Sequence, residues 1–529
     1  MKNNKNKAII LTIITVTALV ILVVGATYAY FQAQVGDPAV ADIKVNANTV
    51  DTFTFSSGSA ISFSINQDNF ASGKGNQTGS TYASAMLTAN NKTNTATEHY
   101  YLYLNIESNT FTYSINESTP EIIMTVTDSS GNEVTDISTL NHVIVTGANN
   151  TQVSGYDITN KNGLITLFNN REITTASSKE ERWNIKVTFV NYDASQNANA
   201  GKSMSAKVMI QKEKIPNVSD ICSNGENLST CITTLSQKSV SGVTNIYHHD
   251  STLANGANDN SYRYAGANPN NYVCFGSTAA SCPTDNLYRI IGVFGDQVKL
   301  IKYDYANSNL LGTDGDYSTD TYSKSAYSTY KGELTTINLY YWNNSTQTNT
   351  WSESNLNKVN LNQNFVNNIG TQWANKIATT TWKVGGNTWE NIGEQPAQTA
   401  YQNEIVSPVT TNTTDSKTEY KAKVGLMYVS DYMYAAPQDK WTLVGCNYED
   451  ASTDYRAATS VNWMYMGLRE WTISRYADAS SYAFYVYDDG GMDSFGVDFD
   501  YGVRPSFNLS SSITYVSGRG SANDPILIN

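Results

Sequence analysis

The chain carries little charge, and this scarcity excludes one class of function. Only 15% of its 529 residues are charged, against about 25% in an average soluble protein, and the formal net charge is −13. After Lys7 there is no run of basic residues. Because nucleic-acid binding needs clustered Lys and Arg to neutralise phosphates, no nucleic-acid partner is expected.

Histidine and cysteine are also scarce, which bears on metal and catalytic sites. The chain has four histidines and five cysteines, and no two cysteines have CxxC spacing. A zinc site built from Cys and His is therefore not predicted. Nucleophilic catalysis needs a base beside Ser or Cys. No such arrangement is visible, so we expect a protein that is not an enzyme.

One long hydrophobic run lies near the N-terminus. Residues 8–31 hold no charge, and Lys2, Lys5 and Lys7 precede them. About 20 apolar residues suffice for a helix to cross a membrane, and flanking positive charge stays in the cytoplasm. The pattern predicts a basic cytoplasmic tail over 1–7 and an extracellular remainder. Two interpretations stay open: a single-pass membrane anchor, or a signal peptide that is cleaved to give a secreted protein.

Aromatic residues are abundant and indicate β-structure. They make up 11% of the chain, with 36 Tyr against 15 Phe. Residues 36–212 contain short runs that alternate apolar and polar side chains, separated by Gly, Asn and Asp clusters, which is typical of half-buried antiparallel strands. We expect a jelly-roll-like β-sandwich here. The predicted strands cover residues 52–55, 60–65, 101–106, 122–126, 183–190 and 205–210.

The second half has a mixed pattern. Residues 213–245 are predicted to be a linker containing a short helix over 228–235. Residues 246–529 are predicted to form an α+β domain. Its clearest signals are a hairpin that turns at Gly295-Asp296 and a helical stripe at Phe365, Ile369, Trp373 and Ile377 that Gly370 weakens. Residues 383–421 are expected to be long loops.

Four of the five cysteines form close pairs. In an exported chain such pairs predict disulfides. The expected bonds join Cys222 to Cys231 and Cys274 to Cys282, and Cys446 remains as a buried thiol.

Several segments of the second half resemble a known group of proteins. They are residues 261–276, 287–294, 425–430, 471–475 and the Gly502-Val503-Arg504-Pro505 segment. Together they resemble an uncharacterised family of exported bacterial domains, related to the formylglycine-generating (sulfatase-modifying) and C-type-lectin-like fold. The resemblance implies a lectin-like fold for residues 246–529. Copper-dependent oxidation is not implied, since a late cysteine pair is missing.

The first half resembles a second group. Residues 25–31 followed by a β-rich polar domain are similar to the biofilm-fibre and camelysin proteins of Gram-positive bacteria. The whole chain thus resembles surface proteins of low-GC bacteria.

Candidate binding residues gather between positions 441 and 504. Aromatic and Arg side chains dominate the energetics of many binding sites. The predicted ligand-binding residues are Tyr448, Tyr455, Arg456, Trp463, Tyr465 and Arg475. Carboxylates at Asp488, Asp489 and Asp493 make Ca²⁺ a candidate ligand, although acids are also common in solvated turns. No other cofactor is expected.

These observations predict a cell-surface binding or adhesion protein. A lectin-like head on a β-sandwich stalk would bind an extracellular glycan or protein. One alternative is a structural subunit of an extracellular or biofilm fibre. The other is an envelope enzyme on a sulfatase-modifying-like scaffold.

Overall fold

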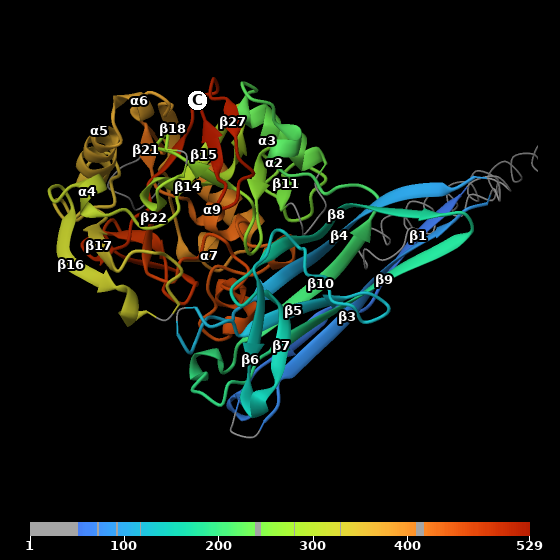
Figure 1. The fold of residues 1–529 in the computed structure, drawn as a ribbon. Coiled ribbons are helices and arrows are strands. Elements are labelled where there is room, and N and C mark those ends of the chain that lie inside the picture. Colours follow the sequence, from blue (N-terminus) through green and yellow to red (C-terminus); the bar gives the residue numbers. More distant parts are fainter. Residues whose placement is uncertain are drawn as a thin grey trace, which may run out of the picture. The chain divides into compact units, whose positions relative to one another are not determined.

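The computed structural model describes residues 51–70, 74–90, 94–116, 118–238, 245–279, 281–327, 329–408 and 417–529. The predicted anchor at residues 8–31 lies outside this part of the chain. Within it, no helix combines the length and apolar character needed to cross a membrane. The structure is mostly β-sheet with few, short helices (Figure 1). The chain divides into two compact units, residues 1–214 (unit 1) and 215–529 (unit 2).

Unit 1 is built from two antiparallel sheets, and its long strands are seen in Figure 1. The six-stranded sheet has the order β1-β3-β9-β5-β7-β6, and the four-stranded sheet has the order β2-β10-β4-β8. All six predicted strands of this half are present. The strands are β1 (Thr52–Ser57), β2 (Ile61–Ser64), β3 (Gln77–Thr88), β4 (Ala96–Asn109), β5 (Ile122–Thr127), β6 (His142–Thr146), β7 (Gln152–Asp157), β8 (Gly163–Thr175), β9 (Ser178–Phe189) and β10 (Ser203–Gln211).

The two sheets of unit 1 share one hydrophobic core, as in a sandwich. Alternation along β9 shows how the sequence produces it: Trp183, Ile185 and Val187 are buried, whereas Asn184 and Lys186 between them are exposed. Ile61 and Leu104 of the smaller sheet belong to the same apolar cluster. Burying one face of each sheet therefore holds the unit together.

Unit 2 is organised around a mixed nine-stranded sheet. Its main path is β21-β26-β15-β14-β13-β28-β27, with β12 also paired to β14 and β11 paired to β12. β13 and β28 run parallel. Gly295, at φ +63°, makes the predicted β14–β15 turn. The strands are β11 (Ile246–His248), β12 (Tyr262–Tyr264), β13 (Tyr272–Cys274), β14 (Leu287–Phe294), β15 (Gln297–Lys302), β21 (Val424–Gly425), β26 (Ser506–Asn508), β27 (Tyr515–Ser517) and β28 (Ile526–Ile528).

Three smaller sheets complete unit 2. Their orders are β16-β17-β25, β18-β20 and β19-β22-β23-β24. β23 belongs to the last of these sheets, and Gly490, at φ +92°, lies in the turn that follows it. The strands are β16 (Tyr317–Ser323), β17 (Thr336–Tyr341), β25 (Asp500–Tyr501), β18 (Thr380–Lys383), β20 (Glu419–Ala422), β19 (Gly386–Asn387), β22 (Glu470–Tyr476), β23 (Tyr482–Val486) and β24 (Met492–Gly496).

The helices of unit 2 are short. The predicted helix over 228–235 is α3. Asn227 caps its N-terminus, because the Asn227 side chain accepts hydrogen bonds from the backbone N–H groups of Ser229 and Thr230. Its apolar side packs into the core of unit 2, so part of the expected linker belongs to that unit. The helices are α2 (Val218–Ile221), α3 (Leu228–Gln237), α4 (Ser308–Leu311), α5 (Val366–Asn368), α6 (Thr371–Ala374), α7 (Trp389–Ile392), α8 (Ala397–Tyr401), α9 (Val429–Tyr434) and the π-helices η6 (Leu356–Phe365) and η7 (Gln402–Val406).

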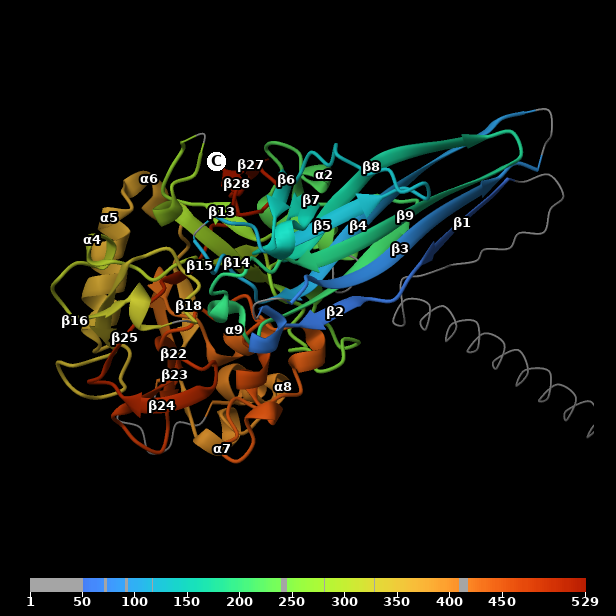
Figure 2. The same cartoon turned by 60° about the horizontal axis from the view of Figure 1, so that its bottom comes forward.

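Two expectations about unit 2 were wrong in detail. The stripe from Phe365 to Ile377 is not one helix, because Gly370 adopts φ +82° and separates α5 from α6. The segment 383–421 is not only loop, because it holds α7, α8 and η7. Figure 2 labels α7 and α8 in the lower part of the view.

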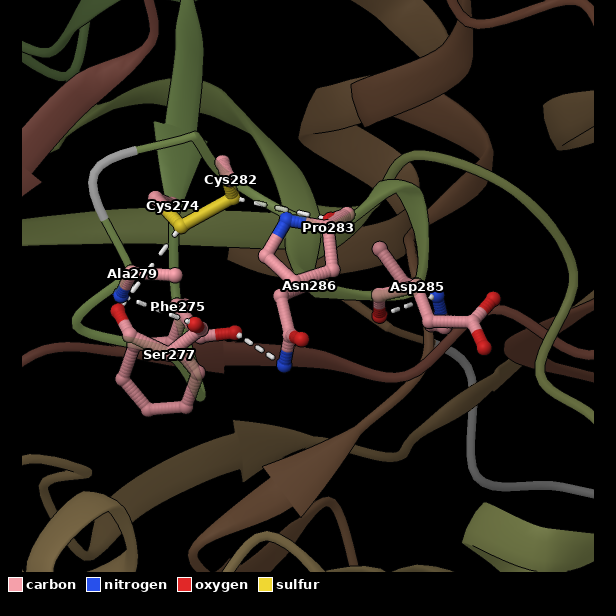
Figure 3. The surroundings of a disulfide bond; sticks show 9 residues. Cys274, Phe275, Ser277, Ala279, Cys282, Pro283, Asp285 and Asn286 are labelled. Atoms are coloured by element: carbon pink, nitrogen blue, oxygen red, sulfur yellow. Dashed lines mark hydrogen bonds between the residues drawn. A yellow bond between two sulfur atoms is a disulfide. The ribbon is translucent and has the colours of Figure 1, made fainter.

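The cysteines behave differently in the two predicted pairs. Cys274 and Cys282 form a disulfide, as expected (Figure 3). Beside it, the Asn286 side chain donates a hydrogen bond of 3.2 Å to the Phe275 carbonyl. Cys222 and Cys231 are free buried thiols, so this prediction is not met. The hydrogen bond that the Cys222 thiol donates to Cys231, together with burial, raises the pKa of Cys222.

Candidate functional site

Most of the predicted ligand-binding residues are buried and serve the fold. Tyr455, Trp463, Tyr465 and Arg475 have almost no exposed surface. Their polar atoms are engaged by main-chain carbonyls: the Tyr455 hydroxyl donates to Met433 (2.9 Å), the Trp463 indole to Tyr264 (2.8 Å) and the Tyr465 hydroxyl to Asp488 (2.5 Å). The Arg475 guanidinium donates to the carbonyl of Lys417 (2.9 Å). Side chains held in this way are not available to a ligand.

The side chains of the other two predicted residues, Arg456 and Tyr448, are accessible to solvent. Arg456 is partly exposed, and its guanidinium binds Asp454 at 2.7 Å. Tyr448 is 70% exposed, and its hydroxyl donates to the Asp493 carboxylate at 3.1 Å. Partial burial and the charge of Asp493 raise the pKa of Tyr448. Tyr448 therefore stays a neutral phenol at physiological pH.

The three aspartates of the predicted calcium site face different partners. Asp488 lies 3.8 Å from Arg469, Asp489 accepts the Gly491 N–H at 3.0 Å, and Asp493 accepts from Tyr448 and from Tyr485 (3.4 Å). No group of three or more His, Cys, Asp or Glu suited to a metal ion occurs in the part of the chain that the structure describes. Calcium binding stays a prediction.

Tyr448 belongs to a larger feature, a continuous row of aromatic rings on α7, β22–β24 and the loops beside them. Figure 2 labels these four elements on the ribbon. Each ring contacts the next, with centroid distances of 5.7, 6.3, 5.8, 6.3, 6.2 and 4.4 Å. We call this set the aromatic row. In order, its members are Tyr448, Trp389, Phe484, Tyr476, Tyr482, Phe495 and Phe499.

The two ends of the aromatic row are open to solvent. Phe499 is 47%, Tyr482 39% and Phe495 37% exposed, so one end has three accessible rings and Tyr448 provides the other. Phe484 is buried between them and anchors the row in the core. Large exposed apolar side chains that lie next to one another are uncommon on soluble domains and mark interaction sites.

Carboxylates accompany the rings. Asp493 lies beside Tyr448, and Asp478 and Glu390 act on Tyr476 closely enough to raise its pKa, although burial is the larger cause. The aromatic row thus combines flat apolar faces with hydrogen-bond acceptors. A ligand with both a nonpolar face and hydroxyl donors fits such a surface.

Sequence reasoning identified Tyr448 but missed Trp389, Tyr482, Phe495 and Phe499. Any strand has two faces, but its sequence does not say which face the rest of the protein covers. Phe499 lies in the turn after β24, next to Asp498. The one sequence signal of an exposed ring was the position of Phe499, an apolar aromatic residue between Asp498 and Asp500.

Comparison with known proteins finds a family match for part of unit 2. Residues 333–511 match a protein family described as a domain of unknown function, DUF6273. This match covers less than half of the chain and includes the whole aromatic row. No curated protein matches the chain.

Among solved structures, one similar chain is TmCBM61 in complex with beta-1,4-galactotriose. It is 11% identical, and the alignment covers 30% of this chain and 88% of that chain, with a TM-score of 0.11. A likeness at this level carries no argument about the fold or the ligand of this protein.

Proposed function

We propose that this protein is a non-enzymatic cell-surface protein whose unit 2 binds carbohydrate through the aromatic row. The observation that carries the proposal is that the rings of the aromatic row contact one another and that those at both ends are exposed. Sugar rings have nonpolar C–H faces that pack on aromatic side chains, and their hydroxyls donate to carboxylates. The predicted export of the chain would bring this surface to envelope or extracellular glycans.

The surface favours a carbohydrate over a nucleic acid or a charged polymer. The carboxylates beside the rings repel polyanions, and the chain as a whole is acidic, with a formal net charge of −13. Neutral glycans do not meet this repulsion. The predicted lectin-like fold of residues 246–529 agrees with this function and belongs to the same proposal.

The test is a glycan array with the full-length chain in detergent, followed by affinity measurements on the glycans that bind. Single substitutions Tyr482→Ala, Phe495→Ala and Phe499→Ala should each weaken binding about two- to tenfold, because an aromatic contact contributes about 0.5–1.5 kcal/mol. Ile144→Ala, which removes an exposed apolar side chain from unit 1, is the matched control and should leave affinity unchanged.

Two outcomes would contradict the proposal. The first is an array on which no glycan binds above background. The second is glycan binding that the three aromatic substitutions leave intact while their melting temperatures stay at the wild-type value.

A further inference from the structure

Unit 2 also contains a cavity that the aromatic row does not use. Its volume is about 180 Å³. It lies among β12, the β14–β15 hairpin, β18, α8 and the start of α9, and we call it the Trp382 cavity. Four aromatic side chains line it: Phe294, Trp382, Tyr401 and Tyr428. Thr381, Lys383 and Ile405 form its more accessible part.

The buried charges of the cavity are already paired. Lys299 Nζ lies 2.5 Å from Asp431 Oδ2, and Arg263 Nη2 lies 2.6 Å from Asp259 Oδ2. Arg263 Nη1 is also 3.6 Å from Asp431 Oδ1. The remaining lining cation, Lys383, forms an ion pair with Glu419. An ionic ligand would bring a charge for which no partner remains, and a buried unpaired charge is strongly disfavoured. The charge balance therefore favours an uncharged ligand.

Hydrogen-bonding capacity remains after this pairing. An ammonium group has three N–H donors, and Asp431 is the one acceptor for Lys299 Nζ among the residues that the structure describes. The Tyr428 hydroxyl accepts the Lys383 N–H at 2.7 Å, and its own hydrogen has no acceptor in that same part of the chain. Both side chains line the cavity, so their free donors meet any molecule that enters it.

The walls and the volume limit the ligand's shape. Lys299 Nζ lies 4.3 Å from the centroid of the Tyr428 ring and 5.4 Å from that of Trp382, so the donors sit beside flat apolar faces. A cavity of about 150 Å³ holds one benzene molecule. A cavity of about 180 Å³ thus holds one substituted six-membered ring and no more.

We propose that the Trp382 cavity binds one uncharged, polyhydroxylated ring: a single sugar residue, with its nonpolar face on the aromatic walls and its hydroxyls on Lys299, Tyr428 and Asp431. The choice of ligand class rests on the proposed function, but the site is separate from the aromatic row. The sugar is either a free monosaccharide or the terminal residue of a glycan.

The experiment is saturation-transfer NMR on the full-length chain with neutral hexoses and N-acetylhexosamines, and with oligosaccharides ending in the same residues. Glucuronate is the charged comparison. Ile405→Trp fills the cavity from its rim without touching an ion pair. Val406→Trp is the matched control, because Val406 is exposed and does not line the cavity. Tyr428→Phe keeps the ring and removes the hydroxyl.

At least one neutral sugar should bind to the wild type and to Val406→Trp. Ile405→Trp should weaken that binding at least tenfold, and Tyr428→Phe should weaken it severalfold. Binding of free sugars alone would identify a monosaccharide ligand, and binding of oligosaccharides as well would identify recognition of a chain end.

Three results would overturn the inference: no neutral sugar binds, glucuronate binds as well as its neutral counterparts, or Ile405→Trp and Val406→Trp bind equally. The Tyr482, Phe495 and Phe499 substitutions separate the two sites. If glycan binding depends on those rings and is unchanged by Ile405→Trp, the cavity site is contradicted and the proposed function is not.

Discussion

At the scale of single residues, unit 2 buries charges in matched pairs. Asp259 illustrates the balance of forces. Burial opposes its ionisation, but the Arg263 guanidinium and hydrogen bonds from Ser261 outweigh burial and hold the pKa of Asp259 well below its usual range. A carboxyl whose pKa is lower in the folded state stabilises the fold above its unfolded pKa of about 4 and ceases to do so as the pH falls.

This balance predicts the effect of Asp259→Asn. At pH 7 the free energy of unfolding of the variant should be about 3 kcal/mol lower than that of the wild type, because the buried Arg263 loses its charged partner. On acidification from pH 7 toward about pH 3, the wild type should lose part of this advantage, because Asp259 takes up a proton in the unfolded chain before it does so in the folded one. Urea unfolding of both proteins at several pH values measures the difference. A gap that stays constant or widens at acid pH would contradict the assignment.

Residue identity alone did not show which aromatic side chains bind and which pack. The stretch 441–475 is dense in Trp, Tyr and Arg, a composition shared by binding sites and by cores with polar edges. Tyr455 and Trp463 turned out to use their polar atoms on backbone carbonyls. Such contacts join residues far apart in the sequence, so no local pattern announces them.

At the scale of elements, every strand predicted for unit 1 is present, although β3 and β8 were not predicted, and the short helices α7 and α8 were missed. Alternation of apolar and polar residues reports directly on a half-buried strand, and β9 follows it over residues 183–187. Helices of four or five residues such as α7 and α8 are too short to repeat a periodic pattern. Their stability comes from tertiary packing, which the sequence of the segment does not contain.

Gly370 gives an element-scale prediction. Its φ of +82° separates α5 from α6, and no atom that is more distant along the chain lies within 4 Å of the place where a Cβ would go. Gly370→Ala should therefore destabilise unit 2 by about 1–2 kcal/mol through backbone strain alone. Chemical denaturation measures this loss.

The control for Gly370 is Gly75→Ala. Gly75 also has open space around its Cβ position but does not have a positive φ. Its substitution should be neutral or stabilise by up to about 1 kcal/mol, since alanine restricts the unfolded chain. Equal destabilisation by both substitutions would mean that backbone conformation at Gly370 is not the cause.

At the scale of the whole molecule, the two units have separate hydrophobic cores. Cooperative unfolding is a property of single domains. Calorimetry of the chain should therefore show two transitions. The double substitution Cys274→Ser with Cys282→Ser should lower one of them, because the disulfide closes a short loop in unit 2 and contributes about 2–3 kcal/mol.

The result that would count against independent units is a single transition, or a shift of both transitions by the double substitution. The same experiment on Ile144→Ala serves as a control for an exposed substitution in unit 1, and neither transition should move by more than about one degree.

The cellular location is the whole-molecule property that the sequence addresses and the structure does not. The hydrophobic run at 8–31 lies outside the described residues, so export, anchoring and cleavage stay predictions. Both the proposed function and the inferred cavity site depend on delivery of unit 2 to a place where glycans are present.

The parallel pairing of β13 with β28 has a consequence for how unit 2 matures. These strands are about 250 residues apart in the sequence, whereas the Cys274–Cys282 bond spans 8 positions at the end of β13. If the chain is exported as predicted and emerges from a translocation channel N-terminus first, both cysteines of this disulfide are outside long before β28, the strand that pairs with β13. The Cys274–Cys282 disulfide could therefore form before the sheet is complete, and β13 would pair with β28 only afterwards.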